Sequence, residues 1–118
     1  MTWAKAAEPY NQATLADAYV LLGREWGADV VPVGLAFQQS QAGNPTLHLH
    51  DLDGKHPTMA GSYLTACCFY TYFYRRSPSG LSRIIYDRGK EWLTIKEGEA
   101  LYLQEIARRS ILMPQGEK

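Results

Sequence analysis

The feature that most constrains the fold is the segment Thr58–Tyr74, which has apolar side chains on nearly every side of an expected helix. Its apolar residues are Met59, Tyr63, Leu64, Cys67, Phe69, Tyr70 and Phe73. A helix that is apolar all round is normally buried, because an exposed helix keeps one polar face for water. The segment is shorter than the ~20 residues that cross a membrane. It therefore predicts a buried core helix and no membrane span.

A short polar turn, Asp53-Gly54-Lys55-His56-Pro57, leads into this helix. Gly54 allows a sharp bend, and Pro57 suits the first helical position, where a backbone N–H would have no partner. We expect the bend to bring the Asp53 carboxylate against the His56 ring, which would fix the ring tautomer and support an imidazolium during catalysis. The turn can thus supply the acid and base of a hydrolytic triad. On spacing alone, an ordinary turn and helix cap is the better interpretation, and the surrounding motifs described below reverse this preference.

The remaining segments alternate between helical and extended patterns. Amphipathic helices are predicted over Asn11–Trp26 and Glu97–Leu112. Extended segments are predicted over Met1–Ala4, Asp29–Val33, Thr46–His50, Ile84–Tyr86 and Trp92–Ile95. Residues 34–44 are expected to form a loop or a short helix, and residues 77–80 are expected to end the apolar helix. A strand, a helix and a strand within 1–33 would form a βαβ unit, which implies a parallel sheet. Pro32 places the second strand at an edge or makes it short.

This set of elements cannot cover the apolar helix. Parallel sheets are stable only when several strands are present and both faces are packed. The chain has 118 residues, of which 46% are apolar, so it supplies at most one globular domain. We therefore expect residues 1–112 to be the C-terminal part of a larger, doubly wound α/β domain, and residues 113–118 to be a loose tail.

The charge balance argues against a nucleic-acid partner. Twelve basic and twelve acidic residues cancel, so the chain lacks the basic footprint of a nucleic-acid-binding protein. The basic pairs Arg75-Arg76 and Arg108-Arg109 fall at the C-terminal ends of expected helices, where cations interact favourably with the helix dipole. Solvated helix ends are therefore the better interpretation of both pairs.

Several short motifs follow one another in a characteristic order. They are Thr2-Trp-Ala4, Asp29-Val-Val-Pro-Val-Gly34, Asp53-Gly-Lys-His-Pro57, Ala60-Gly-Ser-Tyr-Leu-Thr-Ala66, Ser77-Pro-Ser-Gly-Leu81 and Leu103-Gln-Glu-Ile-Ala107. This order resembles the C-terminal region of SGNH (GDSL-type) hydrolases. The resemblance implies a three-layer α/β/α, flavodoxin-like fold and a serine esterase without a cofactor, acting on small-molecule esters or on acyl groups of carbohydrates. It assigns the triad acid to Asp53 and the general base to His56, through the family's final Asp-x-x-His block.

The chain departs from the family pattern at the nucleophile. In the family, the serine lies in a Gly-Asp-Ser block near the N-terminus, and a glycine and an asparagine from two later blocks complete the oxyanion hole. None of these blocks is present here, and no serine lies in a Gly-x-Ser-x-Gly turn. Ser62 lies nearly two helical turns beyond His56 and is expected to point elsewhere. We therefore expect this chain to supply the acid and base, and to be inactive alone.

Two other classes of function remain open. A non-catalytic domain would pair its apolar helix and sheet edge with a partner or with a second copy of itself. A small metal-binding protein is the third hypothesis, because five potential ligands lie within nine residues: His48, His50, Asp51, Asp53 and His56. We expect no metal site, since Asp53 and His56 would already be engaged with each other. Trp3, near an expected strand end, is the candidate for substrate contact.

Overall fold

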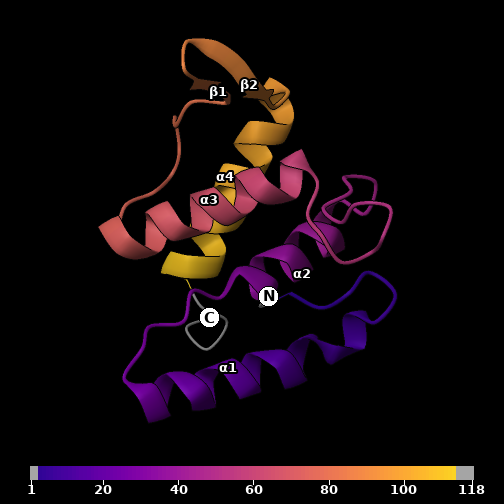
Figure 1. Cartoon of the computed structure of the whole chain (residues 1–118), viewed down its shortest axis with the longest axis vertical. Coiled ribbons are helices and arrows are strands. Elements are labelled where there is room, and N and C mark those ends of the chain that lie inside the picture. Colours follow the sequence, from indigo (N-terminus) through magenta and orange to yellow (C-terminus); the bar gives the residue numbers. More distant parts are fainter. Residues whose placement is uncertain (1–2, 114–118) are drawn as a thin grey trace.

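The computed structural model describes residues 3–113, in which helices predominate. In chain order the elements are a short 3-10 helix (Pro9–Asn11), α1 (Gln12–Trp26), α2 (Val33–Gly43), α3 (Met59–Tyr74), β1 (Ile84–Asp87), β2 (Lys90–Thr94) and α4 (Glu97–Leu112). Figure 1 shows α3 and α4 crossing at the centre, with the β1–β2 hairpin at one end of the molecule and α1 at the other. The molecule is thus a compact, mixed α/β unit with a two-stranded antiparallel sheet.

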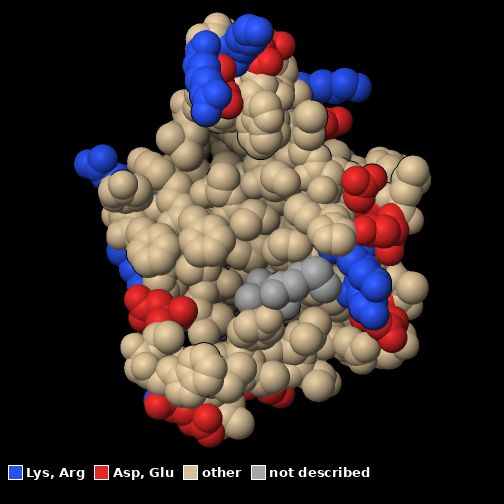
Figure 2. Space-filling model, in the orientation of Figure 1, with Lys and Arg blue, Asp and Glu red and all other residues tan. Residues whose placement is uncertain are grey.

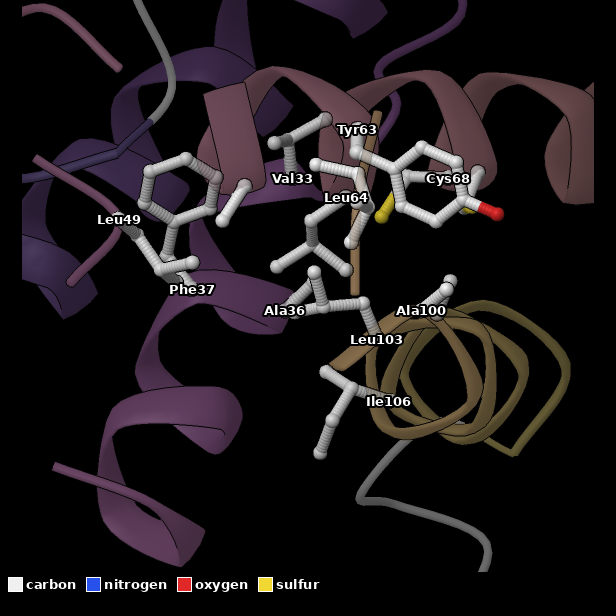
Figure 3. Packing of buried hydrophobic residues seen from close by; sticks show 14 of the residues in the cluster. Val33, Ala36, Phe37, Leu49, Tyr63, Leu64, Cys68, Ala100, Leu103 and Ile106 are labelled. Atoms are coloured by element: carbon white, nitrogen blue, oxygen red, sulfur yellow. The ribbon is translucent and has the colours of Figure 1, made fainter. Parts of the chain in front are cut away.

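The hydrophobic core lies where α2, α3 and α4 meet (Figure 3). Its fully buried side chains include Phe37 of α2, Leu64 of α3 and Leu103 of α4. Leu49 joins this core from the loop between α2 and α3, and no part of its side chain is exposed. The loop that carries the polar turn is therefore fixed to the core just before the turn begins.

The start of α3 is set by Thr58, whose hydroxyl accepts a hydrogen bond from the Gly61 N–H at 3.1 Å. The same hydroxyl donates to the His48 carbonyl at 2.8 Å. Pro57 consequently lies before the N-cap, where it pairs with His50 in an isolated antiparallel bridge. The sequence prediction that Pro57 is the first helical residue was wrong, because Thr58 supplies a side-chain cap one residue later.

Burial of α3 is one-sided. Its inner face includes Leu64, Cys67 and Cys68, which are almost fully buried. Its outer face carries Phe69, 44% exposed, and Phe73, 62% exposed. The prediction that this helix is buried on nearly every side therefore does not hold within the described residues. The inward face packs on α4 and α2, and the described chain provides no layer on the other side.

Helix α1 was predicted correctly from its periodicity but is sparsely covered. It ends at Gly27, which adopts the left-handed conformation with φ 62°. Gln12 is the one buried residue of the helix, and the Trp26 side chain at its end is 77% exposed. An amphipathic helix with so little of its apolar face covered is a candidate for further packing.

The predicted strand over Asp29–Val33 is not formed. Residues 28–32 have no regular structure, and Val33 is the first residue of α2. Among residues 3–113 the only paired strands are the antiparallel β1 and β2, so these residues contain neither a βαβ unit nor a parallel sheet. A strand depends on a neighbouring strand for its hydrogen bonds, and the described chain offers none here. Trp3-Ala4 is likewise not a strand, while Met1 and Thr2 lie outside the described residues.

The β1–β2 hairpin and α4 follow the sequence predictions closely. Ile84 pairs with Thr94, and the connecting turn places Arg88 and Gly89 at φ 53° and 79°, as a two-residue hairpin turn of this kind requires. Helix α4 has its predicted bounds, and the tail over 114–118 lies outside the described residues. No helix in the described part of the chain is both long and apolar enough to cross a membrane.

Candidate functional site

The structure brings Asp53 and His56 together in one turn. The Asp53 Oδ2 atom and the His56 Nδ1 atom are hydrogen-bonded. The other carboxylate oxygen, Oδ1, accepts from the backbone N–H groups of Lys55 at 2.9 Å and His56 at 3.0 Å. Gly54 makes this bend by adopting φ 72°, a conformation that costs a glycine little. The contact expected from the Asp-x-x-His spacing is therefore present.

The electrostatics of the turn favour an ionised Asp53. The hydrogen bond from the His56 side chain holds the pKa of the Asp53 carboxyl well below its ordinary value, and the backbone N–H groups of Lys55 and His56 lower it further. Asp53 therefore remains a carboxylate, able only to accept hydrogen bonds, over the whole physiological pH range. Such an acceptor fixes the proton of the facing histidine ring on Nδ1.

The His56 ring presents its second nitrogen to the outside. The His56 side chain is 78% exposed, and within residues 3–113 its Nε2 atom has no hydrogen-bond partner. With Nδ1 held by Asp53, the neutral ring carries its lone pair on Nε2. The arrangement can therefore accept a proton from a hydroxyl group brought to the surface of the turn.

The serines of the chain do not supply that hydroxyl. Ser40 and Ser110 are buried in the helical core, and Ser82 donates its hydroxyl proton to the Ile84 carbonyl. Ser62 lines a separate apolar hollow beside the hairpin. No serine within the described ranges makes a hydrogen bond with the His56 ring. The pair thus has an acid and a base but no nucleophile in contact.

Trp3, the residue singled out for substrate contact, lies against the same turn. Its indole ring stacks on Phe37, with ring centroids 4.8 Å apart and planes inclined by 11°. Its Nε1–H donates to the Lys55 carbonyl at 2.8 Å. The side chain is half-buried and bound to the protein at both its face and its N–H edge. No sequence pattern indicates this contact with Lys55, because the two residues are 52 positions apart and no local signal links them.

His50, one of the histidines considered as a metal ligand, uses both of its ring nitrogens in hydrogen bonds within the protein. His50 Nε2 lies 2.8 Å from the Ala4 carbonyl oxygen, which can only accept, so this nitrogen carries the proton. His50 Nδ1 then accepts from the Gln41 side-chain amide at 3.2 Å. His48 is exposed on the other side of the extended segment. Residues 3–113 contain no group of three or more His, Cys, Asp or Glu side chains placed to hold a metal ion.

No family model, curated protein or solved structure matches this chain. The candidate site therefore rests on its own geometry, which is an ionised carboxylate, an oriented imidazole and an open Nε2 atom on a short turn.

Proposed function

We propose that this chain is the C-terminal part of an SGNH-type serine esterase and supplies the acid and base of its catalytic triad. Asp53 orients the His56 ring, and His56 is the general base. The observation that carries the proposal is the hydrogen bond between Asp53 and His56 Nδ1, with Nε2 left open. An ordinary Asx turn accounts for the two backbone N–H groups that Asp53 accepts, so the bond to the His56 ring is the contact that supports a catalytic role.

In the proposed reaction, His56 Nε2 removes the proton from a serine hydroxyl as that oxygen attacks the ester carbonyl. The Asp53 carboxylate stabilises the imidazolium that forms. The same proton then passes to the departing alcohol, leaving an acyl-serine. Water attacks this intermediate, again with His56 as the base, and releases the acid. The serine and the oxyanion-hole donors would come from polypeptide outside residues 3–113, and no cofactor is needed.

The uncovered faces of the molecule support a larger domain with a sheet layer. A hollow of about 480 Å³ runs between the unpaired segment 29–33 and α3. Its apolar lining includes Val30, Val31, Phe69 and Phe73, and Asp29 and Thr65 add polar side chains. Figure 2 shows one face of the molecule, on which the charged side chains that are drawn lie mainly toward the rim. A β-branched extended segment beside an exposed aromatic face suits the edge of a sheet that another part of the domain completes.

Turnover of p-nitrophenyl acetate tests this proposal. We expect chain 1–118 to hydrolyse the ester no faster than its His56→Ala variant, because His56 has no serine to deprotonate. A protein that also contains the coding sequence upstream of Met1 should be active and should lose at least about a thousandfold in kcat/KM on His56→Ala. Chain 1–118 acting at least about a hundredfold faster than its variant, which is the low end of a general-base contribution, would contradict the assignment of the nucleophile.

A self-associating, non-catalytic domain is the second candidate. The exposure of Trp26, Phe73 and Tyr74, each above 60%, favours it. Phe73 and Tyr74 belong to an aromatic surface of α3 in which Phe73 stacks on Phe69 and Tyr74 contacts Tyr70, and monomeric proteins rarely expose large contiguous apolar patches. Under this hypothesis the Asp53–His56 turn would have only a structural role, and no ester hydrolysis would depend on His56 in any context.

A further inference from the structure

The turn that carries Asp53 and His56 has few connections to the rest of the molecule. Within residues 51–56 most hydrogen bonds are local, such as that from the Gly54 N–H to the Asp51 carbonyl at 2.9 Å. The side chains of Leu52, Asp53 and Lys55 face solvent. A turn this exposed would open readily if it were held only by its own local hydrogen bonds.

All the hydrogen bonds that join residues 52–55 to distant parts of the described chain come from the N-terminal segment. The Trp3 indole N–H donates to the Lys55 carbonyl, and the Ala6 N–H donates to the Gly54 carbonyl, each at 2.8 Å. These two carbonyls are in the middle of the bend between Asp53 and His56. Their positions therefore control how the carboxylate and the imidazole meet.

The N-terminal segment is itself fixed to the core. The Trp3 ring stacks on Phe37, which is 2% exposed. The Ala4 N–H donates to the side-chain oxygen of buried Gln12 at 2.9 Å, and the Ala4 carbonyl accepts from His50. A rigid aromatic anchor held at its face by the core thus presents its one N–H donor to the turn.

We propose that Trp3 is a positioning residue for the Asp53–His56 pair, holding the turn through the Lys55 carbonyl. This inference rests on the proposed function, and it replaces substrate contact as the role of Trp3. The indole does not touch the reacting atoms; it limits the freedom of the peptide between the acid and the base. Catalytic groups need this support, because small displacements of a base cost large factors in rate.

The substitution Trp3→Phe tests the inference in chain 1–118, since phenylalanine keeps the ring stack and removes the N–H donor. We expect the amide protons of Lys55 and His56 to exchange about tenfold faster, as for the loss of one hydrogen bond. The pKa of Asp53, followed by carboxyl-carbon NMR, should rise toward its ordinary value. The matched control is Trp92→Phe on the exposed face of the hairpin, where the Trp92 side chain is 63% exposed, and it should change neither quantity.

Unchanged exchange and an unchanged Asp53 pKa in a folded Trp3→Phe protein would overturn the positioning role alone. An ordinary Asp53 pKa in the unsubstituted chain would instead overturn the Asp53–His56 pair and the proposed function with it. If Trp3→Phe does not fold, hydrogen exchange in the unsubstituted chain tests the positioning role instead. Its Trp3 indole N–H should exchange more slowly than those of Trp26 and Trp92, and equal rates for all three would overturn the inference.

Discussion

The Asp53 carboxylate gathers three donors from its own turn, which are the His56 ring and the backbone N–H groups of Lys55 and His56. All three act over two or three residues of sequence, so the Asp-x-x-His spacing and Gly54 were enough to predict the pair. A carboxylate that accepts several hydrogen bonds resists protonation. Asp53 is therefore expected to remain ionised at a pH where an ordinary aspartate is protonated.

We expect the Asp53 carboxyl in chain 1–118 to titrate below the ordinary aspartate pKa of about 3.9. Because the folded pKa is lowered, the interactions of the pair are fully present above this ordinary value and are lost as pH falls through the folded pKa. The substitution His56→Ala removes the largest cause of the shift and should raise the pKa of Asp53. Carboxyl-carbon NMR against pH measures this directly. A pKa of Asp53 that does not respond to His56→Ala would show that the ring contact is not formed in solution.

At the scale of elements, helices α1, α3 and α4 were predictable because their 3.6-residue periodicity and end signals are local. The absence of a strand over 29–33 was not predictable, because strand formation depends on partner strands that the pattern of the segment itself cannot reveal. The contact of Trp3 with Lys55 was missed for a similar reason, as it is set by the docking of Trp3 on Phe37. The turn was thus predictable and its support was not.

The junction between the turn and α3 depends on Gly61. A Cβ atom at Gly61 would clash with the Leu49 carbonyl oxygen, a backbone atom that cannot swing away. We expect Gly61→Ala to destabilise the protein by about 1–3 kcal/mol, the usual cost of overpacking. Gly98→Ala is the matched control, because a Cβ there meets nothing within 4 Å in the first turn of α4. Urea unfolding compares the two. Equal midpoints would contradict the close approach of α3 to the Leu49 backbone.

At the scale of the whole molecule, one side of the helical core is well packed and another is open. The core residues of α2, α3 and α4 are almost fully buried, whereas Phe69, Phe73 and Trp26 remain in contact with water. Exposed aromatic side chains beside an unpaired extended segment invite association. The architecture therefore predicts a chain that does not remain monomeric alone.

Sedimentation velocity at low micromolar concentration should show self-association of chain 1–118. The substitution Phe73→Ser on the outer face of α3 should reduce it, because this removes 62%-exposed aromatic surface. Thr94→Ser, an exposed position on β2, is a surface control and should leave the association unchanged. A compact monomer that melts cooperatively in the unsubstituted chain would contradict the incomplete-layer account.

In the proposed function, His56 is oriented by Asp53 and activates a serine. Labelling by a fluorophosphonate tests it most directly, because this reagent reacts with a serine only when a base has activated it. The protein to label is residues 1–118 joined to the N-terminal part of the domain that the proposed function requires. The account predicts labelling of one serine per chain, retained in the His48→Ala control and abolished in His56→Ala. Equal labelling of the His56→Ala variant, or no labelling of any form, would contradict the account.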